Sequence, residues 1–395
     1  MRIVHVLTRL LRAGSEENTL ASCHSQAAMG HEVHLVHGRD FDSHYYDRPM
    51  AGIVLHKVDS LVHPLAPVYD VRAFRELVLL FRRLKADIVH THQSKAGIVG
   101  RFAAQAAGVP HIVHGVHIVP FVNVGRAQRT IYIAAEKSAA LFTAAFIDVS
   151  RGVRDLCVEA GVGRPEQHHV IHSGFDLDRF FGATPPEDWR KILGIGPDVR
   201  RPPVVVMLAA LEQRKRHCEF LDVFPRVLAS HPDTILVMAG EGPHREAVEA
   251  KIRALGLEAN ARLTGYRTDP HRLIALGDLC VLTSTREGLP RVIMQYVAAG
   301  RACVVNDIPG IDEVIVDDYN GIITPAHDMA ATANAISDLL SDRSKLARLT
   351  AGAELTDLSS WRVEYMCAQI EEVYRGLMGG NSCYPKTSST STAAS

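Results

Sequence analysis

The fold is decided by the stretch D-L-C-V-L-T-S-T-R-E-G-L-P-R-V-I-M-Q-Y-V-A-A-G-R-A-C-V-V-N-D-I-P-G, residues 278–310. Its apolar run 279–282 is typical of a buried strand. A polar loop follows, and Pro290 suits the first turn of a helix, where its missing N–H is not needed. That helix ends before Gly300, and a second apolar run, 302–305, predicts the next parallel strand. The stretch is therefore a strand–loop–helix–strand unit.

Glu287 and Gly288 end the polar loop of this unit, directly before the predicted helix. Free N–H groups and the positive end of the helix dipole favour an anion such as phosphate at this position. Gly288 lets a ligand approach the backbone closely. A carboxylate repels phosphate, so Glu287 is better suited to accept hydrogen bonds from hydroxyl groups. The pair indicates a sugar phosphate, although an ordinary helix start with a local acidic residue explains the spacing equally well.

Bulk composition narrows the class of protein. A chain of 395 residues is too long for one typical core, so two domains are expected. The net charge of −1 gives no reason to expect nucleic acid as a partner. No apolar run reaches the ~18–20 residues of a membrane span, and the N-terminus lacks the pattern of a signal peptide, so a cytoplasmic location is predicted. The seven cysteines form no C-x-x-C pair and are expected to be reduced thiols.

Two groups of histidines raise the question of a metal. His90 and His92 form one group, and His168, His169 and His172 form the other. Neither group comes with carboxylates or cysteines at the spacing of metal ligands. The sequence therefore predicts no metal site.

Strands and helices alternate along both halves of the chain, which predicts an α/β protein with two doubly wound parallel sheets. Proline and glycine concentrate in 164–203, the composition of a linker. Near the end of the second half, a long helical region is expected at 329–349. The predicted organisation is an N-terminal domain at 1–175, a linker at 176–203, a second domain at 204–360, a final helix at 361–378 and a disordered tail at 379–395.

Polar residues follow several predicted strands of the first half. Gly14 precedes a helix, the loop 91–97 (T-H-Q-S-K-A-G) follows one strand, and His114 and His117 stand at the end of another. In an open α/β sheet, ligands bind at the carboxyl ends of the strands. We therefore expect a binding site at this edge.

The second half offers basic residues at a strand end. Arg214 and Lys215 follow the predicted strand 204–208, on the same edge as Glu287. A diphosphate would suit such a pair of cations, and a surface cluster of salt bridges is the alternative.

The predicted helix 71–84 is basic on one side. It carries Arg72, Arg75, Arg82 and Arg83, with Lys85 just beyond. A solvated helix face is the favoured interpretation. The alternative is peripheral contact with the inner membrane surface, to which Arg126 and Arg129 would add.

At this point the sequence resembles a known family. The run E-G-L-P-R-V-I-M-Q-Y-V-A-A-G is similar to the motif E-G-x-P-x-x-x-x-E-A-x-A-x-G of the GT-B-fold glycosyltransferases of family 4. Four further segments resemble the family and occur along the chain in the family's order: H-T-H-Q-S-K-A-G, V-I-H-S-G-F-D, M-A-G-E-G-P and T-G-Y-R-T-D. The resemblance covers nearly the whole chain. It implies two Rossmann-like domains that face a central cleft, with a final helix that crosses back to the first domain.

The resemblance implies three catalytic residues. Glu287 would contact hydroxyls of the donor hexose, Lys215 would stabilise the leaving diphosphate, and His117 would lie near the transferred sugar or the acceptor. It also implies a donor-binding set, which consists of Gly14, Arg214, Gly242, Arg267, Gly288, Leu289 and Gln295. Within this set, the backbone at 288–289 would approach the phosphates and position 295 would hold the ribose.

The implied reaction is a retaining, metal-independent transfer of a hexose from a UDP- or GDP-linked sugar to a glycan or lipid-linked acceptor. No cofactor is implied, and the pathway would be surface polysaccharide, lipopolysaccharide or glycolipid synthesis. Gln295 replaces the family's second glutamate, Ala210 a common arginine, and Ala13 the first glycine of a pair. These departures keep open a catalytically degenerate sugar-nucleotide or glycan-binding protein. A sugar-nucleotide epimerase on the same fold is the other alternative.

Overall fold

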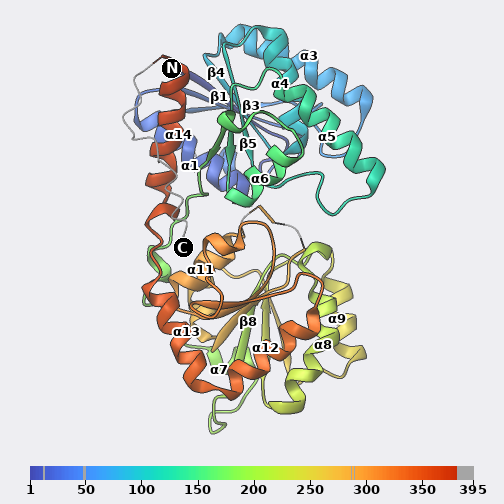
Figure 1. Cartoon of the computed structure of the whole chain (residues 1–395), viewed down its shortest axis with the longest axis vertical. Helices are drawn as coiled ribbons and strands as arrows, with labels where there is room; N and C mark the ends of the chain where they lie inside the picture. Colours follow the sequence, from blue (N-terminus) through green and yellow to red (C-terminus); the bar gives the residue numbers. More distant parts are fainter. Residues whose placement is uncertain (12–13, 48–49, 286, 289, 380–395) are drawn as a thin grey trace, which may run out of the picture.

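The protein is described here by a computed structural model, which covers residues 1–11, 14–47, 50–285, 287–288 and 290–379. Ala13, Leu289 and the predicted tail from residue 380 onward lie outside the described residues. The chain forms two α/β lobes, one above the other in Figure 1, each built on a parallel sheet. This is the predicted fold class.

The N-terminal sheet has seven parallel strands in the order β3-β2-β1-β4-β5-β6-β7. The chain order reverses between β1 and β4, and a ligand site is expected at such a switch point. The strands are β1 Arg2–Leu7, β2 Glu32–His37, β3 Ile53–Lys57, β4 Ile88–His92, β5 His111–Val116, β6 Ala145–Asp148 and β7 His168–Val170.

The C-terminal sheet has six parallel strands in the order β10-β9-β8-β11-β12-β13, and its switch point lies between β8 and β11. Its strands are nearly continuous apolar runs, because helices cover both faces. They are β8 Val204–Leu208, β9 Ile235–Ala239, β10 Ala261–Gly265, β11 Leu279–Leu282, β12 Cys303–Asn306 and β13 Gly321–Thr324.

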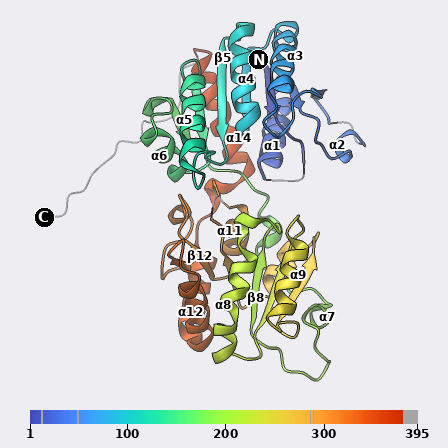
Figure 2. The same ribbon diagram turned by 90° about the vertical axis from the view of Figure 1, so that its right-hand side faces the viewer.

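Helices cover both faces of the two sheets (Figures 1 and 2). In the N-terminal half they are α1 Gly14–Ala28, α2 His44–Asp47, α3 Pro67–Leu84, α4 Ser94–Ala107, α5 Arg126–Ala140 and α6 Arg151–Glu159. In the C-terminal half they are α7 Trp189–Leu193, α8 His217–Ser230, α9 Arg245–Ala254, α10 Pro270–Leu276, α11 Arg291–Ala298, α12 Met329–Ser341, α13 Arg343–Leu355 and α14 Val363–Leu377.

The last helix, α14, returns to the N-terminal lobe and packs against α1 (Figure 1). Its apolar face joins a core cluster under the first sheet, where Met366, Ile370 and Tyr374 meet Ile3 and Ile88. The chain therefore passes between the lobes twice, once before β8 and once after α13.

Some local predictions differ from the structure. The predicted loop 91–97 is mostly helical, because α4 already begins at Ser94. The long helical region predicted at 329–349 consists of two helices, since Asp342 accepts hydrogen bonds from the N–H groups of Ser344 and Lys345 and so starts α13. Strand β13 was not predicted. Among the described residues, no helix has both the length and the apolar character needed to cross a membrane.

Candidate active site

Three charged side chains meet at the switch point of the C-terminal sheet. Lys215 and Arg214 lie in a short 3-10 turn after β8, and Glu287 lies in the loop after β11. The ammonium of Lys215 donates to Oε1 of Glu287. Nη1 of Arg214 lies 2.9 Å from the same oxygen. The structure thus brings together the carboxylate and the two cations that the sequence placed 72 residues apart.

Glu287 is held in its ionised form by this arrangement. Only 8% of its side chain is exposed. Burial alone would raise the pKa of its carboxyl group, but the charges of Lys215 and Arg214 outweigh burial and hold the pKa below its ordinary value. Lys215 is also buried, so this is a partly desolvated ion cluster rather than a surface salt bridge.

Hydrogen bonds fix the two loops that carry the cluster. The backbone N–H of Thr285 donates to the carbonyl of Arg214 at 2.9 Å. The hydroxyl of Thr283 donates to the carbonyl of Lys215 at 2.7 Å. These bonds set the distance between the basic turn and the acidic loop, so the charges meet without depending on long flexible side chains alone.

The acidic loop also touches the opposite lobe. A Cβ atom on Gly288 would lie 1.7 Å from the carbonyl oxygen of His117, so only glycine fits there. The hydroxyl of Ser150 donates to the carbonyl of Gly288 at 3.2 Å, and Nδ2 of Asn123 donates to the carbonyl of Thr285 at 2.7 Å. The loop that carries Glu287 therefore lies at the contact between the two lobes, against the backbone of His117.

His117 follows β5 and is oriented from behind by a second histidine. Its Nε2 lies 3.1 Å from Nδ1 of His92. Burial lowers the pKa of His117 to about 4, so the imidazole is neutral at neutral pH. His114 is different, because it points to the other face of the sheet, where its Nδ1 lies 2.9 Å from the hydroxyl of Thr91. The ring of His114 is therefore held within the N-terminal lobe, whereas the backbone of His117 meets Gly288 of the other lobe.

Two further predicted residues lie on the helices that border the cleft. Gly14 is the first residue of α1, and a Cβ atom there would meet open space. The start of α1 is tied to the start of α11 by an ion pair between Glu17 and Arg291. Gln295 lies one turn further along α11 and is 8% exposed. The first turns of α1 and α11 therefore lie next to each other, although they belong to different lobes.

Gly242 and Arg267 have structural partners of their own. A Cβ atom on Gly242 would lie 2.4 Å from the carbonyl oxygen of Leu211, so this glycine lets two loops pack together. Arg267 forms a two-point ion pair with Asp269 at 2.7 and 2.6 Å. Nothing in the described residues links Arg267 to Glu287 or Lys215. Leu289, the remaining donor-binding prediction, lies outside the described residues.

The loop T-H-Q-S-K supports the fold more than it offers ligand groups. Oε1 of Gln93 accepts hydrogen bonds from the backbone N–H groups of Thr8 at 2.9 Å and Arg9 at 3.2 Å. Lys95 pairs with Asp70 at 2.5 Å and donates to the carbonyl of Pro64. These polar groups are therefore engaged within the N-terminal lobe.

Sequence reasoning missed Glu313, which links the two lobes. Its carboxylate accepts from the backbone N–H groups of Arg151 at 2.6 Å and Gly152 at 3.4 Å, at the start of α6. Its other oxygen lies 2.8 Å from Nε2 of His172. The sequence does contain a sign of this residue, because two acidic residues, Asp312 and Glu313, follow the P-G turn that ends the motif stretch. The partners of Glu313 could not be predicted, because they lie about 140–160 residues earlier in the chain.

Comparison with known proteins agrees with this architecture. The family description "Glycosyltransferase Family 4" matches residues 13–179, and "Glycosyl transferases group 1" matches residues 189–356. Among curated relatives, a UDP-Gal:alpha-D-GlcNAc-diphosphoundecaprenol alpha-1,3-galactosyltransferase of Escherichia coli is 29% identical over 72% of this chain and 74% of its own length. The putative glycosyltransferase EpsD of Bacillus subtilis is 27% identical over 79% of this chain and 80% of its own.

Solved structures show the same fold. The chain is similar to Anabaena Alr3699/HepE in its complex with UDP and glucose, with a TM-score of 0.77 over 95% of this chain and all of that one, at 21% identity. The two family matches divide the chain near the passage between the lobes and together span both of them. This chain belongs to the family 4 glycosyltransferases with the GT-B fold.

Proposed function

We propose that this glycosyltransferase moves a hexose from a UDP- or GDP-linked sugar to a glycan or lipid-linked acceptor, with retention of configuration and without a metal at the phosphates. The proposal rests on one observation. A buried carboxylate, Glu287, is held between Lys215 and Arg214, next to the contact of Gly288 with the backbone of His117. Surface polysaccharide, lipopolysaccharide or glycolipid synthesis is the setting that we propose for it.

The cations suit the diphosphate of the donor. Cleavage of the sugar–phosphate bond leaves negative charge on the departing nucleoside diphosphate, and fixed cations stabilise that charge most strongly where water is excluded. Lys215 and Arg214 supply such charges, which is the role that a metal ion plays in other phosphate sites. When a phosphate group of the donor binds Lys215 and Arg214, it replaces Glu287 as their partner. The carboxylate can then accept hydrogen bonds from sugar hydroxyls. No cofactor is required for these steps.

The relatives support the substrate classes. The Escherichia coli relative is named for a UDP-linked galactose donor and a diphosphoundecaprenol acceptor, which is a lipid-linked glycan. The Anabaena protein of similar fold was solved with UDP and glucose. We infer a nucleotide sugar and a glycan or lipid-linked acceptor for this chain on that basis.

The test is a donor screen. Purified protein is incubated with UDP- and GDP-linked hexoses, with and without lipid-linked or glycan acceptors, and released nucleoside diphosphate is measured. We expect release with one donor class, and a loss of at least ~100-fold in kcat/KM for Glu287→Gln. Glu249→Gln is the matched control, because Glu249 forms an exposed ion pair with Arg245 in the same lobe. Equal activity of Glu287→Gln and wild type would refute the role of Glu287.

Other outcomes of the same screen distinguish the alternatives. An epimerase would convert one nucleotide sugar into another without an acceptor and without releasing nucleoside diphosphate. A degenerate binding protein would give heat in calorimetry with a nucleotide sugar but no turnover with any acceptor. Gln295, in place of the family's glutamate, is the residue that favours the second alternative.

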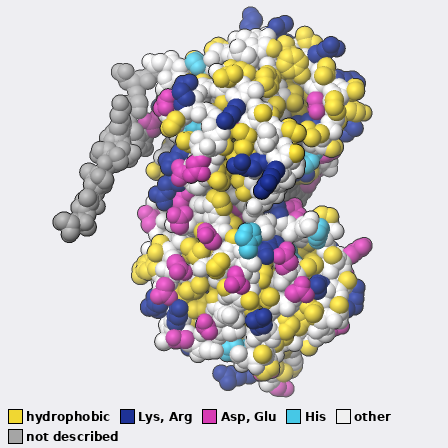
Figure 3. All heavy atoms as spheres, turned by 45° about the vertical axis from the view of Figure 1, so that its right-hand side comes forward, with side chains coloured by type: hydrophobic (Ala, Val, Ile, Leu, Met, Phe, Trp, Pro, Cys, Tyr) yellow, Lys and Arg dark blue, Asp and Glu magenta, His cyan; other side chains and the backbone are white. Residues whose placement is uncertain are grey.

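We also propose that the N-terminal lobe contacts the inner face of the cytoplasmic membrane. Its helices α3 and α5 expose apolar side chains, with Val68 82%, Leu79 67% and Ile131 65% exposed. Basic residues lie among them, and Figure 3 shows dark blue and yellow side chains together on the upper lobe. Exposed apolar groups beside cations suit an anionic lipid surface, where a lipid-linked acceptor would be found.

Vesicle sedimentation tests this contact. We expect binding to vesicles of phosphatidylglycerol and phosphatidylcholine, and little binding to phosphatidylcholine alone. Arg126→Glu combined with Arg129→Glu should weaken the binding at least ~10-fold. The control with the same change of charge is Arg226→Glu with Arg253→Glu, two exposed residues of the other lobe. Equal binding of both double variants would rule out this face.

A further inference from the structure

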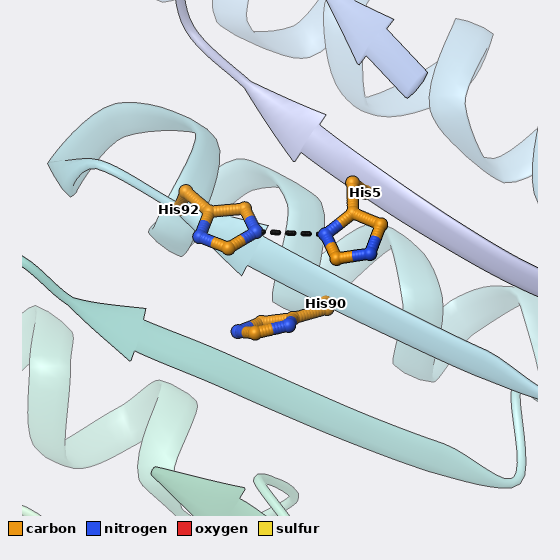
Figure 4. A group of neighbouring side chains, drawn as sticks. All are labelled: His5, His90 and His92. Carbon is orange, nitrogen blue, oxygen red and sulfur yellow. Dashed lines mark hydrogen bonds between the residues drawn. The ribbon is translucent and has the colours of Figure 1, made fainter. Parts of the chain in front are cut away.

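Three histidines lie together in the interior of the N-terminal lobe, at the switch point between β1 and β4. They are His5 on β1 and His90 and His92 on β4, and none is more than 3% exposed. Side chains alternate along a strand, so His90 and His92 point to the same face of the sheet, and His5 is the register partner of His90. Figure 4 shows the hydrogen bond between His5 and His92, with the ring of His90 beside them.

Three histidines are unusual on this face of the sheet. The same face of the sheet otherwise carries apolar residues such as Ile3, Ile88 and Val113, which pack under α14. Burying imidazoles where apolar side chains would pack costs free energy unless the nitrogens have partners. Five of the six ring nitrogens have a hydrogen-bond partner among the described residues, which leaves Nε2 of His90 without one.

The nitrogens converge at the spacing of metal ligands. One nitrogen from each of the three rings lies within 4.8 Å of the others, and Nδ1 of His5 is 3.0 Å from Nε2 of His92. A tetrahedral ion with bonds of about 2.0–2.1 Å holds its ligand nitrogens about 3.3 Å apart. The His5–His92 pair, which is hydrogen-bonded in this structure, already has nearly this spacing, and an ion would replace the proton between the two nitrogens. The ring of His90 lies 4.1 Å from that of His92, centre to centre, and has to turn to bring in the third nitrogen.

Each ring is also oriented by a partner on its other nitrogen. Nε2 of His5 lies 2.8 Å from Oε1 of Gln26, an oxygen that can only accept, so the proton of His5 is on Nε2 and its Nδ1 lone pair faces His92. Nδ1 of His90 lies 2.6 Å from the hydroxyl of Tyr374. Nδ1 of His92 lies 3.1 Å from Nε2 of His117. Such outer partners are the usual support of metal-binding histidines.

His90 carries the second, independent sign of a ligand. Its Nε2 is buried and has no hydrogen-bond partner in the part of the chain that the structure describes. A cavity of about 20 Å³ beside it is lined by His90, His92 and His117, and is large enough for one water. Gly115 forms one wall, where a Cβ atom would lie 3.2 Å from His90 Nε2 and 2.9 Å from His92 Nδ1.

We propose that His5 Nδ1, His90 Nε2 and His92 Nε2 bind one transition-metal ion of the zinc class, with water from the adjacent cavity as a further ligand. Imidazole nitrogens suit zinc and its neighbours in the first transition row. The ion would join β1 to β4, and through Gln26 and Tyr374 it would hold α1 and α14 on the sheet. Its role is structural, because Lys215 and Arg214 serve the phosphates from the other lobe.

The charge of the site sets its affinity. All three ligands are neutral, so the ion keeps its full charge in a buried position. We therefore expect weaker binding than at zinc sites with thiolate ligands. The sequence predicted no metal because His90 and His92 come without carboxylates or cysteines, and only the pairing of β1 with β4 adds His5 to them.

The experiment measures metal on the full chain, purified without a polyhistidine tag. Mass spectrometry of the purified protein should find about one metal ion per chain. Chelator-treated protein should recover that ratio when Zn²⁺ alone is added, with a rise in melting temperature. Co²⁺ in place of Zn²⁺ should give the visible absorption of a nitrogen-ligated ion. Wild-type protein that takes up no ion beyond weak surface binding would overturn the proposal.

Variants separate this site from the other histidines of the chain. His90→Gln should lose the ion, and Gln26→Ala, which removes only an outer partner, should bind it about 10–100-fold more weakly. His34→Gln is the matched control, since His34 and His56 form another histidine pair, at 3.0 Å, without a third nitrogen. If His90→Gln does not fold, the metal affinity of Gln26→Ala tests the proposal instead. Uptake by the test variants equal to that of His34→Gln would show a hydrogen-bonded cluster without a metal.

Discussion

Gly288 contacts the backbone of His117 so closely that any side chain at position 288 would enter the carbonyl group: a Cβ atom would lie 1.7 Å from its oxygen. This contact joins the loop that carries Glu287 in one lobe to the end of β5 in the other. We expect Gly288→Ala to push the lobes apart, and to lower kcat/KM at least ~100-fold, because reacting groups displaced by about 1 Å lose that much. Steady-state kinetics with the donor found in the screen measures this.

Gly376→Ala is the matched control for this substitution. Gly376 lies in α14, where a Cβ atom meets nothing within 4 Å. Alanine should leave activity unchanged there and stabilise the helix by up to ~1 kcal/mol. If Gly288→Ala keeps wild-type kcat/KM, the two lobes do not need this contact for catalysis.

Lys215→Met tests the proposed stabilisation of the leaving group. The variant keeps the volume of the side chain but removes its charge, while Arg214 remains beside Glu287. We expect kcat to fall about 10²–10³-fold, with a smaller change in KM, because the charge on the diphosphate is greatest in the transition state. Lys251→Met, which removes an exposed partner of Asp222, is the control. A rise in KM at unchanged kcat would instead assign Lys215 to ground-state binding.

Gln295→Glu should strengthen donor binding if position 295 holds the ribose. A carboxylate accepts a hydroxyl hydrogen bond more strongly than an amide, by ~1 kcal/mol, which corresponds to about a fivefold lower donor KM. The value of kcat should change little, because the ribose is remote from the reacting bond. A higher KM in Gln295→Glu would show that the amide is adapted to a different contact.

Glu313→Ala should weaken the junction between the lobes. The carboxylate is 2% exposed and accepts from two backbone N–H groups at the start of α6. Removing it leaves the first N–H groups of α6 without their acceptor, and the loss of such a cap costs ~0.5–2 kcal/mol in the free energy of unfolding. Denaturant unfolding measures the loss, and Glu313→Gln, which keeps one acceptor oxygen, should lose less. Equal losses in the two variants would contradict the capping role.

His217 should make stability depend on pH. Burial, together with the charges of Lys215 and His244, lowers the pKa of this imidazole from 6.5 to about 4. The unfolded chain therefore binds an extra proton between pH 6.5 and 4, so the free energy of unfolding falls as the pH drops through this window. The contribution is up to ~3 kcal/mol at pH 4. His217→Gln should remove that part of the pH dependence, and an identical pH profile in both proteins would refute it.

The sequence alone determined the repeating parts of the fold. Strands such as β8 and β11 are short apolar runs that end in polar loops, and their burial on both faces leaves few alternatives. The helix after Pro290 and its end before Gly300 follow from local backbone chemistry. Glu287 and Gly288 were identifiable because they lie in one continuous motif, and Lys215 because it follows a predicted strand. The break between α12 and α13 was not, because the cap at Asp342 lies within an otherwise helical pattern.

Only the tertiary structure decided which distant groups meet. Lys215 and Glu287 form an ion pair because β8 and β11 are neighbours in the sheet, and Glu313 reaches α6 because the lobes face each other. His5 joins His90 and His92 through the pairing of β1 with β4. Local patterns determine each strand and helix, whereas the pairing of strands distant in sequence is set by the packing of the whole core. Contacts of that kind cannot be deduced from any one segment.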